Sequence, residues 1–303
     1  MATYSEIVRL APWFFPVGSA IIGACIGSFL NVCIYRIPKN ESVVRPGSHC
    51  GCGQPIAWYD NIPVFSWLIL RGRARCCGRP FSFRYPAIEL LTAGLFLTCW
   101  LLFPPGKAIA GMVFCSILIC ATFIDLDHLI IPDAFTLGGA VVGVLLSMLL
   151  PALHGQVHEI FVVASLRAAV DSVLGLLLGS ALVLWIALLA EVVLKKEAMG
   201  FGDVKFLGTI GAFVGWKGAV FSIFGGAMVG CVWFVIALLW QKATGQERPQ
   251  PVVAPAEGDA PQPAIGFGVQ VPFGPMLAIA ALLYFLVLHH WVDAYFSGLQ
   301  VMF

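Results

Sequence analysis

Apolar segments follow one another along almost the whole chain, and each is about as long as a helix that crosses a bilayer. Such a helix needs about 20 mostly apolar residues. With 60% hydrophobic and 11% charged residues, the chain has too few polar residues to cover a soluble domain. We therefore predict an all-α polytopic membrane protein with about eight transmembrane helices. The predicted spans lie near residues 11–35, 86–103, 108–124, 134–152, 170–194, 206–220, 219–240 and 272–291.

The polar stretches between these spans predict the domain organisation. Arg36 and Lys39 follow the first apolar stretch rather than precede it, so we expect a retained anchor and not a cleaved signal peptide. The stretch after position 240 is rich in Pro, Ala, Gln and Glu and has little to bury. The predicted parts are residues 1–35 (first transmembrane helix), 36–85 (cytoplasmic domain with a cysteine cluster), 86–240 (membrane core), 241–271 (flexible cytoplasmic linker) and 272–303 (final transmembrane helix and outward-facing tail).

The basic residues predict the orientation of the chain. Eight spans place four polar segments on one side, and these segments carry 13 of the 17 Lys and Arg residues. Loops rich in Lys and Arg stay in the cytoplasm, so both chain ends are expected to face outward. The cytoplasmic basic residues are Arg36, Lys39, Arg45, Arg71, Arg73, Arg75, Arg79, Arg84, Lys195, Lys196, Lys205, Lys242 and Arg248. No basic pattern typical of a nucleic-acid partner accompanies them.

Two aspartates lie where apolar segments meet short polar ones, Asp125 after one span and Asp203 before another. Ionisable groups beside membrane spans are costly to bury, which makes them functional candidates. Two carboxyls that share one water can hydrolyse an amide when one is ionised and the other protonated. The spacing alone leaves Asp127 as open as Asp125. Helix capping is the alternative for all of these acids, and it is the preferred interpretation for Asp133.

Four of the ten cysteines cluster in the basic loop, as Cys50, Cys52, Cys76 and Cys77. A disulfide framework is unusual in a reducing cytoplasm. Two cysteine pairs separated by roughly twenty residues are typical of a structural zinc site, so these four are the predicted Zn²⁺ ligands. Both pairs are tighter than the usual pair with two intervening residues. The alternative is a set of reduced, unliganded thiols.

Several short motifs follow one another in order along the chain. They are Gly27-Ser28-Phe29-Leu30-Asn31-Val32, Tyr35-Arg36-Ile37-Pro38, Asp60-Asn61-Ile62-Pro63, Ser66-Trp67-Leu68, Arg84-Tyr85-Pro86, Glu89-Leu90-Leu91, the Asp125 segment and Gly200-Phe201-Gly202-Asp203. In this order they resemble the bacterial prepilin peptidases, the type IV prepilin leader peptidase/N-methyltransferase family, over nearly the whole chain. The resemblance implies an intramembrane aspartyl peptidase of the Gly-x-Gly-Asp class in the bacterial inner membrane, with its active site facing the cytoplasm. By position, Asp125 and Asp203 match the catalytic pair of the family.

The resemblance also implies a second activity and the substrates. Family members with the cysteine-bearing loop methylate the new N-terminus with S-adenosylmethionine, for which Glu89 is a weak candidate binding residue. The implied substrates are type IV prepilins or the pseudopilins of type II secretion, held in the lipid bilayer. The family usually shows two Cys-x-x-Cys pairs. Here the first pair is one residue shorter, Ala74 occupies one expected cysteine position, and Cys76 would have to substitute.

Two other classes of protein compete with a peptidase. A proton-coupled transporter also places acids among eight spans, but its acids are expected near the bilayer midplane, commonly between repeated halves. A membrane scaffold of the pilus assembly machinery would leave the acids without a catalytic role. Unimpaired pilin processing in an Asp203 variant would favour the scaffold.

Overall fold

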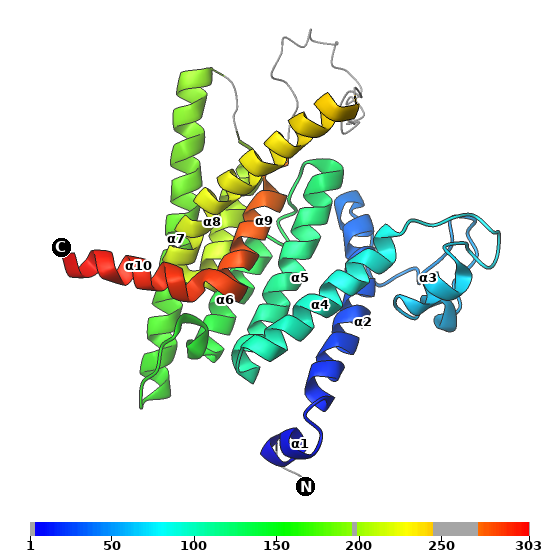
Figure 1. The fold of residues 1–303 in the computed structure, drawn as a ribbon, viewed down its shortest axis with the longest axis horizontal. Coiled ribbons are helices and arrows are strands. Elements are labelled where there is room, and N and C mark those ends of the chain that lie inside the picture. Colours follow the sequence, from blue (N-terminus) through cyan, green and yellow to red (C-terminus); the bar gives the residue numbers. More distant parts are fainter. Residues whose placement is uncertain (1–3, 196–198, 245–271, 303) are drawn as a thin grey trace.

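The computed structural model describes residues 4–195, 199–244 and 272–302. These residues form helices with no strand among them, as the sequence predicted (Figure 1). Most of the predicted linker, 241–271, lies outside the described residues. The elements are α1 Tyr4–Leu10, α2 Phe14–Arg36, η1 Ile37–Lys39, η2 Trp58–Asn61, α3 Phe65–Leu70, α4 Arg84–Leu102, α5 Pro105–His128, α6 Leu137–Leu149, η3 Pro151–His154, α7 Phe161–Leu194, α8 Phe201–Thr244, α9 Gly274–Leu283, the π-helical η4 Tyr284–Leu288 and α10 His289–Met302.

Six of the described helical segments are long and apolar enough to cross a membrane. They correspond to α2, α4, α5, α7, α8 and the continuous run of α9, η4 and α10. The predicted fourth span is the shorter apolar helix α6, and the predicted sixth and seventh spans both fall within α8. The polytopic helical architecture is therefore confirmed, whereas the count of eight full spans is not.

Helix α8 reverses direction at Gly215, where the backbone is not helical (φ 72°, ψ 179°). A Cβ built on Gly179 of α7 would lie 2.8 Å from the Leu207 carbonyl oxygen and 3.3 Å from the Ala219 Cβ. Those two residues would be about 18 Å apart in a straight helix. Both lie beside Gly179, so the second half of α8 runs back along α7. Glycine suits this turn because its φ is positive.

Buried hydroxyl groups stabilise this reversal, since a break in a helix leaves carbonyl groups without intrahelical partners. The Ser172 hydroxyl of α7 donates to the Ala212 carbonyl oxygen at 2.7 Å, and the Ser147 hydroxyl of α6 lies 3.5 Å from the same oxygen. His154 Nε2 hydrogen-bonds the Ser147 hydroxyl at 2.9 Å. Three separate elements are thus joined to the turn.

Glycines let the helices approach closely in two places. In α2, a Cβ on Gly23 would lie 2.8 Å from the Ala93 Cα of α4, and one on Gly27 would lie 2.7 Å from the Glu89 Cα. In α7, a Cβ on Gly175 would overlap the Gly211 carbonyl oxygen of α8. Small residues at such contacts favour helix association where the hydrophobic effect between helices is weak. They bring α4 and the start of α8 into fixed positions.

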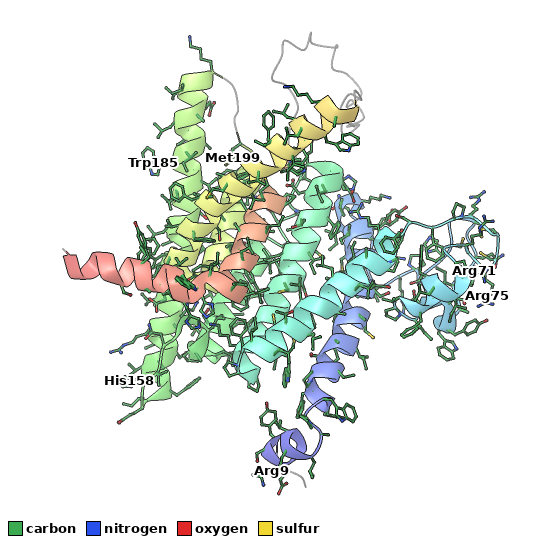
Figure 2. The ribbon with its side chains drawn as sticks, viewed as in Figure 1. Arg9, Arg71, Arg75, His158, Trp185 and Met199 are labelled. Atoms are coloured by element: carbon green, nitrogen blue, oxygen red, sulfur yellow. The ribbon has the colours of Figure 1, made fainter. Side chains whose placement is uncertain are left out.

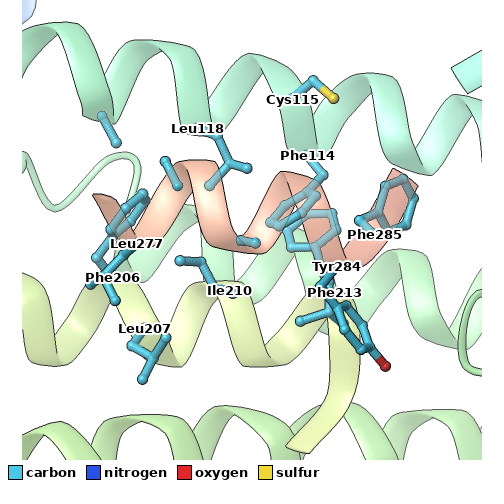
Figure 3. Close-up of a cluster of buried hydrophobic side chains, with 14 of the residues drawn as sticks. Phe114, Cys115, Leu118, Phe206, Leu207, Ile210, Phe213, Leu277, Tyr284 and Phe285 are labelled. Atoms are coloured by element: carbon cyan, nitrogen blue, oxygen red, sulfur yellow. The ribbon is translucent and has the colours of Figure 1, made fainter. Parts of the chain in front are cut away.

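The apolar core lies between α5, α8 and α9 (Figure 3). The Phe114 ring of α5 stacks on the Phe213 ring of α8 with centroids 4.8 Å apart, and it meets the Phe285 ring edge-on at 5.6 Å. Leu118 and Leu277 are fully buried in the same cluster. Because three helices share one core, it fixes the start of α9 relative to the C-terminal end of α5.

The polar segment between η1 and α4 forms a small module that includes α3 and lies beside α2 and α4 (Figure 1). Figure 2 shows Arg71 and Arg75 on this module, away from the helical bundle. Arg36, which is 7% exposed, ties the module to α2, since its guanidinium donates to the carbonyl oxygens of Ser42, Pro46 and Gly47. The predicted cytoplasmic domain is thus anchored at its first residue.

Candidate active site and metal centre

Asp125 lies in the last turn of α5, and its side chain is buried, with 5% of the residue exposed. Leu129 ends this helix with a positive φ of 54°, and its N–H donates to the Asp125 carbonyl oxygen. The Asp125 side chain meets the N-terminal end of α9, where the Gly274 N–H donates to Oδ2 at 3.1 Å. A segment 149 positions further along the chain therefore forms one wall of this site.

Asp203 lies in the first turn of α8 and is partly exposed. Ile131 connects its surroundings to those of Asp125. A Cβ on Gly202 would lie 3.6 Å from the Ile131 Cβ, and a Cβ on Gly274 would lie 3.2 Å from the Ile131 Cδ1. The two acids thus share one region, at the meeting of α5, α8 and α9.

Asp127, which the spacing left as an alternative, has a different environment. Its carboxylate accepts two hydrogen bonds from the Arg84 guanidinium of α4, at 2.7 and 2.8 Å. Arg84 also donates to the Phe123 carbonyl oxygen and lies over the Phe123 ring. Such a bidentate pair is stronger and more specific in geometry than a single contact. Asp127 therefore connects α5 to α4 at the point where the module ends.

Asp133 is exposed and pairs with Lys205 of α8 at 2.6 Å. The Lys205 ammonium holds the pKa of the Asp133 carboxyl below its usual range. The Thr136 hydroxyl also donates to the Asp133 Oδ1, at 3.4 Å. Helix α6 begins only at Leu137 and has Thr136 at its N-cap position, and the Asp133 carboxylate contacts a lysine and a hydroxyl instead of a backbone N–H. The capping interpretation of Asp133 is therefore wrong.

The four clustered cysteines lie on two short loops of similar build. An isolated β-bridge closes each loop, His49 with Pro55 and Arg73 with Pro80. Each loop turns through a glycine with positive φ, Gly53 at 87° and Gly78 at 67°. The second loop is one residue longer, and Ala74 follows its bridge where Cys50 follows the first. The two loops together present all four thiols to one point.

The thiol geometry fits a tetrahedral metal. The Sγ atoms of Cys50 and Cys77 are 3.5 Å apart, those of Cys52 and Cys76 are 3.4 Å apart, and all four lie within 4.8 Å of one another. Four thiolates around Zn²⁺ at about 2.3 Å have sulfurs about 3.8 Å apart. Cys76 thus occupies the fourth corner that the unusual spacing left in question. The cluster lies at the module surface, where a metal bound by all four thiols would join the two loops.

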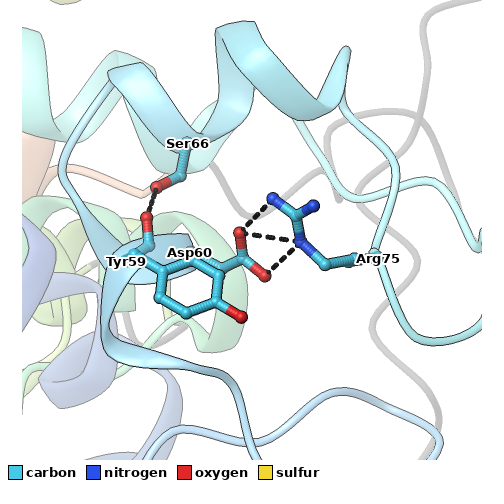
Figure 4. A network of polar contacts seen from close by, with 4 residues as sticks. All are labelled: Tyr59, Asp60, Ser66 and Arg75. Atoms are coloured by element: carbon cyan, nitrogen blue, oxygen red, sulfur yellow. Dashed lines mark hydrogen bonds and ion pairs between the residues drawn. The ribbon is translucent and has the colours of Figure 1, made fainter.

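An ion pair supports the second cysteine loop (Figure 4). The Arg75 guanidinium, next to Cys76, donates three hydrogen bonds of 2.8 to 3.1 Å to the Asp60 carboxylate of η2. This contact lowers the pKa of the Asp60 carboxyl below its usual range. The Ser66 hydroxyl of α3 donates to the Tyr59 carbonyl oxygen at 3.3 Å. The Asp60-Asn61-Ile62-Pro63 motif is thereby held against the cysteine loop.

Protein-family models match both the part of the chain that carries the cysteine module and the part that carries Asp125 and Asp203. Residues 21–103 match the bacterial peptidase A24 N-terminal domain, and residues 112–235 match the type IV leader peptidase family. The chain belongs to the type IV leader peptidase family. The first match spans the cysteine module, Arg84 and Glu89, and the second spans both Asp125 and Asp203. The chain is a multi-pass membrane protein of this peptidase family.

Relatives in this family are similar over most of the chain. A prepilin leader peptidase/N-methyltransferase of Myxococcus xanthus is 37% identical over 263 residues, which are 86% of this chain and 73% of the relative. One of Pectobacterium carotovorum is 34% identical over 303 residues, 91% of this chain and 95% of the relative. A type 4 prepilin-like proteins leader peptide-processing enzyme of Escherichia coli is 38% identical over 230 residues, which are 69% of this chain and 81% of the relative. No solved structure matches the chain. These similarities do not support the transporter alternative.

Glu89, the candidate for methyl-donor binding, lies within α4 and is 8% exposed. Its Oε2 accepts the Val64 N–H at 2.7 Å. Val64 precedes α3 with a φ of 63°, a strained conformation for a β-branched residue. The buried carboxylate therefore holds a strained turn of the module against α4, a contact that the leader peptidase motifs alone do not predict.

Two contacts of this leader peptidase were not foreseen from the sequence. Gly274 and Pro275 lie at the start of the predicted span 272–291, and nothing local connects them to Asp125. Arg84 was counted as a basic loop residue, whereas it clamps Asp127. The one local signal for Arg84 was an arginine at the boundary of a span in the Arg84-Tyr85-Pro86 motif. Both contacts join segments far apart in the chain.

Proposed function

We propose that this chain cleaves the leader peptide from type IV prepilins with Asp125 and Asp203 as an aspartyl pair, and then methylates the new N-terminus. The observation that carries the proposal is the arrangement of these two acids around Ile131, where α5, α8 and α9 meet. Asp127 and Asp133 already have cationic partners. This leaves Asp125 and Asp203 as the acids available to a water and a peptide bond.

The proposed reaction uses the pair in two roles. One ionised carboxylate accepts a proton from a water that attacks the scissile carbonyl, while the other carboxyl donates a proton to the developing oxyanion. The first carboxyl then passes its proton to the leaving nitrogen as the C–N bond breaks, and a hydroxyl of the intermediate returns a proton to the second carboxylate. Repulsion between neighbouring carboxylates generally favours a state in which the two share one proton. Gly200 and Gly202 leave room for an extended substrate backbone beside Asp203. The apolar helix of the prepilin remains in the bilayer.

The pair is proposed to face the cytoplasm of a bacterium with the chain in its inner membrane. The Lys and Arg residues of the module and of the segments at the two ends of α8 support this orientation by the positive-inside rule. The basic leader of the substrate then meets the enzyme on that side. Pseudopilins of type II secretion are proposed as substrates alongside type IV prepilins.

The residues 36–85 are proposed as the methylating part and the residues 86–240 as the peptidase core. S-adenosylmethionine supplies the methyl group when bound. A shallow, open hollow on the module is lined by Pro46, Gly47, Ser48, His49, Gly53 and Pro55 and is the proposed place for this donor. Zn²⁺ held by Cys50, Cys52, Cys76 and Cys77 is proposed to stabilise this part, because its core is small.

The proposed function is tested by incubating the purified chain with a prepilin and S-adenosylmethionine. Mass analysis of the product is expected to find the mature N-terminus with one added methyl group. Without the methyl donor, the same mature product is expected without the added mass. A prepilin that stays intact in both reactions would contradict the peptidase proposal, and a mature product without methyl would contradict the second activity alone.

Glu89 is proposed to support methylation through the Val64 turn. Glu89→Gln keeps an acceptor oxygen for the Val64 N–H, whereas Glu89→Ala removes it. We expect methylation of a pre-cleaved pilin to stay near the wild-type rate in Glu89→Gln and to fall about tenfold in Glu89→Ala, as loss of one buried hydrogen bond allows. Equal loss in both variants would instead indicate that the carboxylate charge contacts the methyl donor.

A further inference from the structure

The first turn of α9 has one backbone donor without a partner in its own helix. Pro275 has no N–H, and the N–H groups of Met276 and Leu277 both bond the Phe273 carbonyl oxygen, at 3.0 and 3.1 Å. The first N–H groups of a helix have no intrahelical acceptors. Among these residues only the Gly274 N–H remains, and it points at the Asp125 carboxylate.

The contact between Gly274 and Asp125 also leaves no room for a side chain at position 274. A Cβ on Gly274 would lie 2.6 Å from the Asp125 Oδ2, 3.3 Å from its Cγ and 3.2 Å from the Ile131 Cδ1. Real Cβ atoms do not approach an oxygen at 2.6 Å, so a side chain here would displace the carboxylate. Gly274 is itself buried, as are Asp125 and Leu277. Gly274 is thus enclosed by the Asp125 carboxylate on one side and by the apolar core around Leu277 on the other.

We propose that Gly274 is a positioning residue of the peptidase site, and that the start of α9 fixes the Asp125 carboxylate in its working orientation. Its N–H holds Oδ2, and its missing side chain provides the space that the carboxylate fills. Because an N–H only donates, Oδ2 acts as an acceptor, so the proton shared by the pair lies on another oxygen. This proposal rests on the assignment of Asp125 and Asp203 as the catalytic pair.

The proposal gives the C-terminal part of the chain a role in cleavage. Residues 272–302 follow the segment that the family match covers, which ends at residue 235. The core around Leu277, Phe114 and Phe213 holds α9 in register with α5 and α8. A carboxylate with a fixed hydrogen bond loses little orientational freedom during the reaction, which is the basis of preorganised catalysis.

The test uses Gly274→Ala in the 303-residue chain, with Gly138→Ala as the matched control. Gly138 lies in the first turn of α6, and a Cβ there would lie no closer than 3.8 Å to its nearest neighbour, the Asp133 carbonyl oxygen. For Gly274→Ala we expect the kcat of prepilin cleavage to fall at least about 30-fold with KM nearly unchanged, since the change acts on orientation and not on binding. Methylation of a pre-cleaved pilin by the same preparation should stay near the wild-type rate. Gly138→Ala should retain both activities.

The outcomes separate this proposal from the proposed function. Normal cleavage by Gly274→Ala, when Asp125→Asn is inactive, would overturn the positioning role and leave the aspartyl pair in place. Cleavage that persists in Asp125→Asn would overturn the pair and this proposal with it. A parallel fall of cleavage and methylation in Gly274→Ala would also overturn the proposal, because it would indicate a general loss of structure.

Discussion

Asp203→Asn and Asp125→Asn are each expected to abolish prepilin cleavage, with a loss of at least about 100-fold in rate, the lower range for removal of a general acid or base. Asparagine has nearly the size of aspartate, so the packing around α5, α8 and α9 is retained. It cannot accept a proton from water or hold the shared proton of the pair. Cleavage is measured in membranes that carry equal amounts of each variant.

Asp133→Asn is the matched control for these variants. It makes the same substitution in an acid of the same region, and the Asp133 side chain is 61% exposed in its pair with Lys205. Exposed pairs contribute little to stability, so cleavage should stay near the wild-type rate. If Asp133→Asn were inactive while Asp203→Asn still cleaved, the assignment of the pair would be wrong. Cleavage in all three variants would instead favour the interpretation that the chain is a scaffold whose acids have no catalytic role.

Cys52→Ser and Cys76→Ser are each expected to reduce the bound zinc from about one ion per chain to almost none, because a structural site needs all four thiolates. Cys52→Ser removes one ligand from the first cysteine loop, and Cys76→Ser removes one from the second. Zinc in the purified protein is measured by elemental mass spectrometry. Methylation is expected to be lost with the metal, whereas prepilin cleavage at the Asp125 and Asp203 site should be affected less.

Cys231→Ser is the control, since Cys231 is an exposed thiol of α8 far along the chain from the cluster. It should keep the wild-type zinc content and both activities. A wild-type protein purified without zinc would contradict the metal proposal. Unchanged zinc in Cys76→Ser would show that three thiols suffice, and that Cys76 does not substitute for the cysteine missing at Ala74.

The parts that the sequence predicted well depend on local properties. Hydropathy is summed over neighbouring residues, so α2, α4 and α5 lie close to their predicted spans, whereas α7 ends at the predicted residue but begins at Phe161 instead of residue 170. The cysteine pairs were visible in the same way, because each pair lies on one short loop. The reversal within α8 was foreseen only as two overlapping spans, since Gly215 is one of many glycines in the apolar segments and its positive φ of 72° is visible only in the structure.

The amino-acid sequence by itself determined that the chain is a helical membrane protein, with acids at span edges and four thiols in a basic module, because composition and spacing suffice for these features. Only the tertiary structure decided that Asp127 pairs with Arg84, that the Glu89 carboxylate accepts the Val64 N–H, and that the Gly274 N–H donates to Asp125. Each of these contacts joins segments 25 to 149 positions apart. Their partners are selected by how the helices pack, and packing depends on shape and on buried hydrogen bonds that no local pattern encodes.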